Sequence, residues 1–139
     1  MKANELKETD LMIGDWVRVI SAEPNTYRRP FYQIITAEKM MMIRNRRMVV
    51  EPIRLTPVIL ENNGFKVKKI MPFEQKFEHR VGIDGRVELD NRSEYIHSNN
   101  TWAMYIKGDR GITSYVELSF LHELQHQLKH CKINKMLTI

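Results

Sequence analysis

Cysteine is almost absent from this chain, in which Cys131 stands alone. A single cysteine excludes an intramolecular disulfide and indicates a reducing compartment. Long apolar runs are absent too, since no stretch approaches the roughly 18 apolar residues of a membrane-spanning helix. The opening stretch MKANELKETD is too polar to serve as a secretory signal. We therefore expect a cytoplasmic protein that has no membrane partner.

Glycine is scarce, and its positions exclude several common nucleotide and hydrolase motifs. The six glycines are scattered through expected turns, and they form no Gly-x-Gly-x-x-Gly fingerprint, phosphate loop or nucleophile elbow. The carboxylates between residues 84 and 109 are too dispersed to name as a paired acid and base. These patterns therefore predict no catalytic residue.

The composition is that of a globular protein. Of 139 residues, 42% are hydrophobic and 28% are charged, far from the composition of disordered chains. This length fits one domain over residues 1–139, and a chain of this size buries about two-thirds of its unfolded surface, so neither a metal nor a disulfide is needed to hold it. Within this domain we expect an N-terminal β lobe at about 11–55 and a C-terminal α+β lobe at about 56–139.

Short strand-like segments fill the N-terminal part. The stretch IGDWVRVIS alternates apolar and polar residues with the period of two of a β-strand, and PFYQIITAE and RMVVEPI are β-branched or aromatic runs of strand length. Between them, KMMMI fits either a further strand or a turn. Several short strands without helical periodicity indicate a small curled sheet of the SH3-like kind.

A short helix marks the change to the C-terminal part. Thr56 fits an N-cap and Pro57 fits the first helical position, while Gly64 fits the residue with a left-handed backbone that commonly ends a helix. Together they predict a helix over 57–63. The alternating stretch FKVKK that follows predicts a return to β structure.

Two hairpins are expected next. The first is formed by KFEHRV and RVELD, with a three-residue loop in which Gly85 has a left-handed backbone conformation. This loop places Val81 opposite Val87 and His79 opposite Leu89, as the apolar pattern favours. SEYIH and TWAMYIK are expected to form the second hairpin, followed by a loop.

The last expected element is an amphipathic helix from about Tyr115 to Cys131. Leu121, Leu124 and Leu128 form one apolar stripe along it. The expected fold is thus α+β, with an N-terminal SH3-like curled β-sheet and a short helix, then antiparallel hairpins packed with one C-terminal amphipathic helix.

The stretch HELQH carries the most chemistry. On a helix, residues four apart project from one face, so His122 and His126 could grip a zinc ion while Glu123 polarises its water. A hydrolytic site needs a third protein ligand. Lysines occupy the positions where the longer signature places its glycine and third histidine, and no acidic residue follows Glu123. An upstream ligand, His79 or His97, remains open.

Two arguments weigh against this zinc site. His130 lies about 12 Å along the helix from His122, at a rise of 1.5 Å per residue, too far to share its ion. His122, His126 and His130 also fall roughly opposite the leucine stripe, so we expect them to face solvent. We therefore predict no catalytic residue, no metal ligand and no cofactor. The alternative is a zinc-dependent hydrolase with Glu123 catalytic and His122 and His126 as ligands.

Basic residues give the chain a net charge of +5. Clustered arginines attract phosphates through charge and counterion release, and the aromatic residues between positions 16 and 32 could stack on bases. The competing interpretation is a solvated basic surface whose aromatic residues fill the small sheet core. We expect a non-enzymatic binding module with a protein or nucleic-acid partner. The residues expected to contact nucleic acid are Arg28, Arg29, Arg44, Arg46 and Arg47.

Four segments, MKANEL, IGDWV, PIRLTPVILENNGF and YVELSFLHELQHQL, cover roughly a third of the chain. Together they resemble a set of small uncharacterised proteins common in Bacteroidetes genomes, their phages and mobile elements. The C-terminal helix of that set carries a Tyr-Val-His-x-Leu-Gln-x pattern, matched here by His122, Leu124 and Gln125. Position 123 is often Gln there and position 126 often Asn. The resemblance therefore implies that Glu123 and His126 are not essential, and that the chain is a helper or structural-interaction protein.

Overall fold

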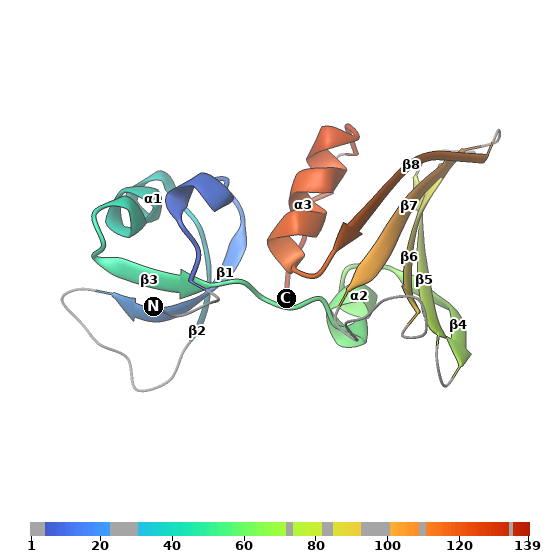
Figure 1. The fold of residues 1–139 in the computed structure, drawn as a ribbon, viewed down its shortest axis with the longest axis horizontal. Helices are drawn as coiled ribbons and strands as arrows, with labels where there is room; N and C mark the ends of the chain where they lie inside the picture. The colour runs from blue at the N-terminus through green and yellow to red at the C-terminus, as the bar shows by residue number, and fades with distance from the viewer. Residues whose placement is uncertain are drawn as a thin grey trace. The chain divides into compact units, whose positions relative to one another are not determined.

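The computed structural model describes residues 5–22, 31–71, 74–81, 85–92, 101–108, 111–133 and 135–139. These ranges form antiparallel sheets of three and five strands together with three α-helices, so the fold is α+β (Figure 1). None of the helices within them is long and apolar enough to cross a membrane. The chain divides into two compact units, one of residues 1–53 and 120–136 and one of residues 54–119 and 137–139.

In chain order the elements are η1 (Glu8–Asp10), β1 (Trp16–Ala22), β2 (Phe31–Ile34), α1 (Ala37–Arg44), β3 (Met48–Glu51), α2 (Pro57–Asn62), β4 (Lys66–Met71), β5 (Glu74–Val81), β6 (Gly85–Arg92), β7 (Trp102–Gly108), β8 (Gly111–Leu118) and α3 (Leu121–His130).

The first unit holds the three-stranded sheet, in the order β2–β1–β3. β1 is antiparallel to both neighbours, and Val17 and Val19 on one of its faces are completely buried. Every second side chain of a strand points to the same face, so these valines pack with Ile35, Ile43 and Val50 into one core. The three expected N-terminal strands are confirmed; the SH3-like form of their sheet stays a prediction.

KMMMI is neither a strand nor a turn, because helix α1 runs through it from Ala37 to Arg44. The hydroxyl oxygen of Thr36 caps the helix by accepting a hydrogen bond from the Lys39 amide at 3.3 Å. Unbranched methionines favour a helix, and a threonine cap fixes its start. Both expectations for this segment are therefore wrong. The helix could not be recognised because Ile43 is its one buried residue, so the sequence shows no apolar stripe.

The second unit holds the five-stranded sheet, a meander in the order β4–β5–β6–β7–β8 with antiparallel neighbours throughout. One face of the sheet is apolar and buried, with Phe77, Leu89, Trp102 and Met104 each at most 1% exposed. The indole N–H of Trp102 donates to the Leu55 carbonyl at 3.3 Å, so its burial leaves no unpaired donor. The opposite face carries the alternating polar residues.

Helix α2 begins as its sequence predicts. The Thr56 hydroxyl accepts a hydrogen bond from the Ile59 amide at 3.3 Å, and Pro57 occupies the first helical position. Gly64 follows the helix with a left-handed φ of +82°, which a residue with a Cβ adopts only at a cost. The predicted helix is confirmed, and it ends at Asn62, one residue before the expected boundary.

The hairpin between β5 and β6 is present, but its register is not the expected one. Val81 lies opposite Gly85 and His79 lies opposite Val87, a shift of two residues, and Gly85 is not left-handed. A shift of two keeps every side chain on the same face of the sheet. The apolar pattern therefore fits both registers equally and could not distinguish them.

The C-terminal helix begins later than expected. Tyr115 lies in strand β8, and α3 starts only at Leu121. Ile112, Tyr115 and Val116 are strand-favouring residue types, which explains why helical periodicity does not extend to them. The expected strand TWAMYIK is confirmed as β7, whereas its expected partner SEYIH lies outside the described residues.

Helix α3 belongs to the first unit and not to the C-terminal part in which we expected it. Its first amide, that of Leu121, donates to the Ile53 carbonyl at 2.8 Å, and the helix contacts β1. The helix therefore packs with the N-terminal strands that precede it by some 70 residues or more in the sequence. No sequence pattern indicated this pairing.

Candidate functional site

Glu123, the expected catalytic residue of a zinc hydrolase, is turned toward the start of α3. Its Oε1 accepts a hydrogen bond from the Phe120 amide at 3.0 Å. A carboxylate in the first turn satisfies an otherwise unpaired amide and lies at the positive end of the helix dipole. The group that would have to polarise a metal-bound water thus stabilises the helix end.

His122 is buried, which contradicts the expectation that it faces solvent. Only 6% of it is exposed, and its ring is stacked on Phe120 with centroids 6.0 Å apart. Burial lowers the pKa of His122 below its ordinary value, against the opposing pull of Glu123 and Asp15. Its Nδ1 has no hydrogen-bond partner among the described residues. The prediction failed because α3 buries two adjacent faces, one with leucines and one with His122 and Gln125.

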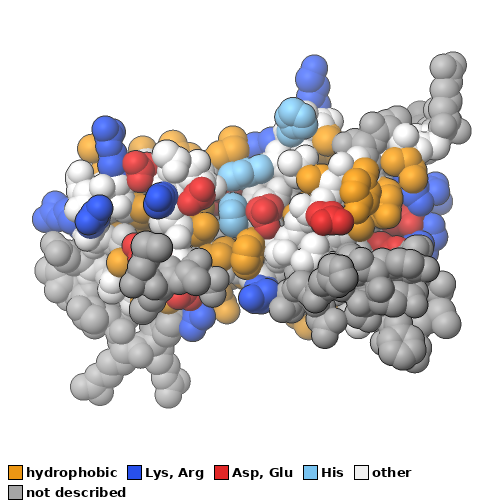
Figure 2. Space-filling model, viewed as in Figure 1, with side chains coloured by type: hydrophobic (Ala, Val, Ile, Leu, Met, Phe, Trp, Pro, Cys, Tyr) orange, Lys and Arg blue, Asp and Glu red, His pale blue; other side chains and the backbone are white. Residues whose placement is uncertain are grey.

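His126 contacts a carboxylate that sequence reasoning missed. Its Nε2 lies 2.6 Å from Oδ2 of Asp15, whose side chain is 1% exposed. The same Asp15 oxygen accepts a hydrogen bond from the Met12 amide at 2.7 Å. This contact joins α3 to the turn before β1 within the first unit, and Figure 2 shows histidine side chains at the surface along α3. The Gly-Asp turn at positions 14 and 15 gave a strand start but no hint of this partner.

Near α3, Nε2 of His126 and Oδ2 of Asp15 contact each other directly. Nδ1 of His122 and Oδ1 of Asp15 are buried and have no hydrogen-bond partner among the described residues. Within the described ranges, no group of three or more His, Cys, Asp or Glu side chains has the geometry to hold a metal ion. His79, one expected upstream ligand, lies in the second unit with Nδ1 3.3 Å from a backbone carbonyl. The other, His97, lies outside the described residues.

The arginines expected to contact nucleic acid fall into two groups. Arg28 and Arg29 lie outside the described residues. Arg44 ends α1, Arg46 and Arg47 follow it, and all three are exposed. Arg46 has a left-handed φ of +60°, and its amide and that of Arg47 donate to helix carbonyls at 3.1 and 2.7 Å. Three of the five arginines therefore surround one helix end.

A second concentration of charge lies on the polar face of the five-stranded sheet, which we call the charged face. Strand pairing places alternate residues of neighbouring strands side by side, so charges spread over about 50 residues of sequence meet here. The segments KVK, KFEHR and RVELD carried the signal, since each alternates charged residues with apolar ones. The charged face comprises Lys66, Lys68, Lys76, Glu78, Arg80, Arg86, Glu88, Asp90, Tyr105, Lys107, Ile112, Tyr115 and Glu117.

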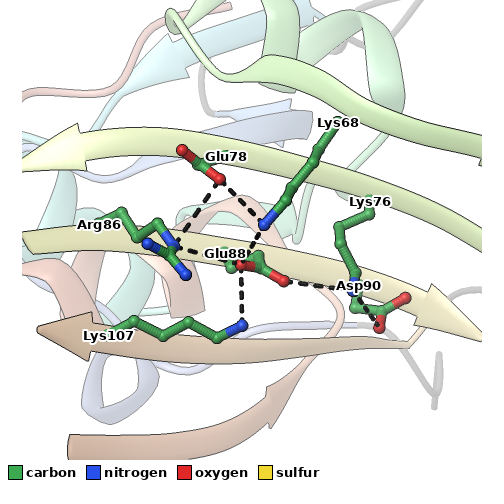
Figure 3. A network of polar contacts seen from close by, with 7 residues as sticks. All are labelled: Lys68, Lys76, Glu78, Arg86, Glu88, Asp90 and Lys107. Atoms are coloured by element: carbon green, nitrogen blue, oxygen red, sulfur yellow. Dashed lines mark hydrogen bonds and ion pairs between the residues drawn. The ribbon is translucent and has the colours of Figure 1, made fainter. Parts of the chain in front are cut away.

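Glu88 lies at the centre of the charged face with cations around it (Figure 3). Its carboxylate is approached by the ammonium groups of Lys107 at 3.0 Å, Lys68 at 3.3 Å and Lys76 at 3.3 Å. The guanidinium of Arg86 lies 3.6 Å away. These cations come from β4, β5, β6 and β7, so one carboxylate ties together four strands.

The cations keep Glu88 ionised. Burial by itself raises the pKa of this carboxyl group, but hydrogen bonds from Lys107 and Lys68 and their positive charges outweigh it and lower the pKa to about 2. A group with such a pKa cannot exchange a proton near neutral pH, so it is unsuited to general acid or base catalysis. Glu88 acts instead as a counter-ion that holds the surrounding cations in place.

Two of the three acids of this network are buried, whereas two of its cations are about two-fifths exposed. The side chains of Glu88 and Asp90 are 1% and 2% exposed, whereas those of Lys68 and Arg86 are 42% and 41% exposed. Glu78, directly opposite Glu88, is bridged to it by the same Lys68 and Arg86. The charge that the face presents to solvent is therefore more positive than its composition suggests.

Two tyrosines adjoin the cations on the charged face. The rings of Tyr105 and Tyr115 have centroids 5.1 Å apart, and the Lys107 ammonium lies 5.7 Å from the Tyr105 centroid. Tyr115 is 53% exposed, and its hydroxyl donates to Glu117 at 2.9 Å, which raises the pKa of Tyr115. Figure 2, which colours tyrosine as hydrophobic, shows such side chains at the surface over β8. The arrangement can stack a planar ring beside a positive charge.

Comparison with models of known protein families, with curated proteins and with solved structures found no match for this chain.

Proposed function

We propose that the chain is a non-enzymatic binding module whose charged face contacts single-stranded nucleic acid. The observation that carries the proposal is the exposed Tyr115 ring against Tyr105, with Lys107 beside them on the polar face of the sheet. Base stacking on an aromatic ring next to a cationic groove is the usual way in which proteins bind single strands without sequence motifs.

The electrostatics of the charged face support a polyanionic partner. Lys68 and Arg86 are exposed over about two-fifths of their side chains, while Glu88, which pairs with both, is buried and Glu78, their second partner, is 24% exposed. A phosphate backbone that approaches from solvent therefore meets cations first and releases counterions on binding. The pKa of Glu88 and the capping role of Glu123 also support a module that binds and does not catalyse.

The resemblance to proteins of Bacteroidetes phages and mobile elements gives this proposal a setting. Its segments include IGDWV, which leads into β1, and PIRLTPVILENNGF, which contains α2. A cytoplasmic helper protein that handles nucleic acid fits such a setting. The resemblance supports the class of function and leaves the contact residues to be argued from the charged face.

The proposal predicts a specific loss in Tyr115→Ala. Fluorescence anisotropy of a labelled oligothymidylate with the full chain should show binding that Tyr115→Ala weakens about tenfold, since stacking one base contributes about 1–3 kcal/mol. Tyr32→Ala is a matched control, because Tyr32 is 54% exposed against 53% for Tyr115 but lies on β2 in the first unit. Absence of binding at low salt, or equal losses in both variants, would contradict the proposal.

A triple change of Arg44, Arg46 and Arg47 to Ala measures what the first unit contributes. For each phosphate of a single strand that these arginines neutralise, the slope of log affinity against log salt should become shallower by about 0.7 in the variant. If the charged face alone binds the strand, the slope stays unchanged. If the arginines also bind it, the slope falls while the Tyr115→Ala effect persists, and both units then contribute cations to binding.

A further inference from the structure

The end of α3 is built from a residue type that its backbone disfavours. Lys132 has a left-handed φ of +60° at the position where α2 has Gly64, at +82°. The chain turns there as it does after α2, with the amides of Cys131, Lys132 and Ile133 donating to helix carbonyls at 3.0, 3.0 and 2.8 Å. Glycine is the residue that this position favours. Lysine at this position therefore keeps a cation beside the helix end at an energetic disadvantage.

A pocket of about 220 Å³ lies beside this turn, within the first unit. Lys129 and Lys132 are exposed and Lys135 is half-buried, and none of the described residues that line the pocket is acidic. The side-chain amide of Gln125 is fixed by donating to the Lys135 carbonyl at 3.0 Å, although Gln125 itself is only 4% exposed. The pocket is lined by Gln125, Lys129, Lys132, Ile133, Lys135 and Met136.

Three ammonium groups around a small pocket repel one another unless an anion lies between them. A helix C-terminus ordinarily disfavours an anion, because its carbonyls carry partial negative charge. Here the amides that follow α3 already cap three of those carbonyls, those of Gln127, Leu128 and Lys129. The local balance of charge at the pocket is therefore set by the lysines.

We propose that this pocket binds a phosphate group through Lys129, Lys132 and Lys135. Lysine ammonium groups act as point charges toward phosphate, whereas arginine provides the planar fork that matches a carboxylate. The volume is below the range of about 300–1,000 Å³ typical of pockets for whole drug-sized ligands, so it suits one phosphate group with part of the molecule that bears it. The group can belong to a small phosphorylated compound or to a nucleic-acid backbone. This site is independent of the charged face.

The test is a titration of the isotope-labelled full chain, followed by NMR at constant ionic strength in chloride, with pyrophosphate as probe. Saturable shifts are expected at the amides of residues 129–133, with an affinity that falls at least tenfold in Lys132→Gly. That variant removes the charge and suits the left-handed backbone, so it is expected to fold. Lys7→Ala, which removes an exposed lysine just before η1 in the same unit, is the matched control and should leave the affinity unchanged.

The source of the phosphate follows from a second titration with oligothymidylate. Shifts at residues 129–133 with pyrophosphate support a small phosphorylated ligand, and shifts there with the oligonucleotide alone support a backbone phosphate. Shifts that stay linear with both probes, or an affinity that is unchanged in Lys132→Gly, overturn the proposal. Failure here leaves the nucleic-acid proposal intact, because Tyr115→Ala tests that separately.

Discussion

Two basic residues of the first unit have a left-handed backbone conformation, which lowers the stability of the fold. Arg46 and Lys132 both have φ of +60° just after the C-caps of α1 and α3. The left-handed conformation costs an L residue about 1–2 kcal/mol, and glycine adopts it freely. The second unit uses Gly64 for the same turn. Since glycine would make this turn without strain, the arginine and the lysine occupy these positions at a cost in stability.

Replacing either cation by glycine should therefore stabilise the protein. We expect Arg46→Gly and Lys132→Gly each to raise the free energy of unfolding by about 0.5–1 kcal/mol, because glycine removes the strain of the left-handed backbone but loses more entropy on folding. Urea unfolding followed by circular dichroism measures this difference. Lys132→Ala is the control, since it removes the charge and keeps the strain. If Ala stabilises as much as Gly, charge repulsion and not the backbone is responsible.

Elements whose start and stop residues are distinctive could be predicted from the sequence. The Thr56-Pro57 start and the Gly64 stop defined α2, and the alternation of Val17 and Val19 with polar residues defined β1. Each of these signals acts within one element. The same local signals could not give the β5–β6 register, because two registers differing by two residues bury the same face.

Elements and contacts that depend on distant segments could not be predicted in this way. Helix α1 has no apolar stripe by which it could be recognised. Strand β8, which contains Tyr115, ends only three residues before α3 begins, so the boundary between the two elements could not be located from the sequence. Burial of His122 depends on α3 packing with the first unit, and the Asp15 contact joins residues 111 positions apart. The charged face likewise needs the pairing order of five strands, so its alternating charges could be seen in the sequence but not assembled.

Helix α3 yields a prediction about metal content. Tag-free protein dialysed briefly against EDTA should retain far less than one zinc per chain, because Glu123 caps the helix and Asp15 holds the His126 nitrogen. Zinc analysis of the wild type beside His126→Ala measures this. A helix with spaced histidines binds zinc weakly through two ligands, whereas a catalytic site has three and retains its metal. About one zinc per chain, absent from His126→Ala, would reverse the conclusion and favour a hydrolase.

Each of the two units contains its own acid-sensitive group, so the stability of the whole molecule should depend on pH in two separate ranges. In the first unit, burial lowers the pKa of His122, so the unfolded chain binds this proton more tightly than the folded one. Its contribution is present above the ordinary histidine pKa of about 6.5 and is lost as pH falls below it. In the second unit, Glu88 has its pKa lowered from 4.5 to about 2. Its contribution is present above 4.5 and is lost as pH falls toward 2.

The two ranges can be separated with one variant in each unit. Glu88→Gln should lower the free energy of unfolding at neutral pH by about 3 kcal/mol, since the pKa of Glu88 is lowered from 4.5 to about 2 and each unit of pKa shift corresponds to about 1.4 kcal/mol. The variant also leaves the cations without their counter-ion. It should also flatten the decline below pH 4.5 while leaving the loss below about pH 6.5 in place. His122→Gln should remove the loss of stability below about pH 6.5 and leave the decline below pH 4.5 in place. Urea unfolding at a series of pH values gives both curves, with Glu61→Gln, an exposed carboxylate of α2, as control. If Glu88→Gln declines below pH 4.5 as steeply as the wild type, the cations around Glu88 do not hold its charge in the folded state, and the charged face loses the counter-ion that orders it.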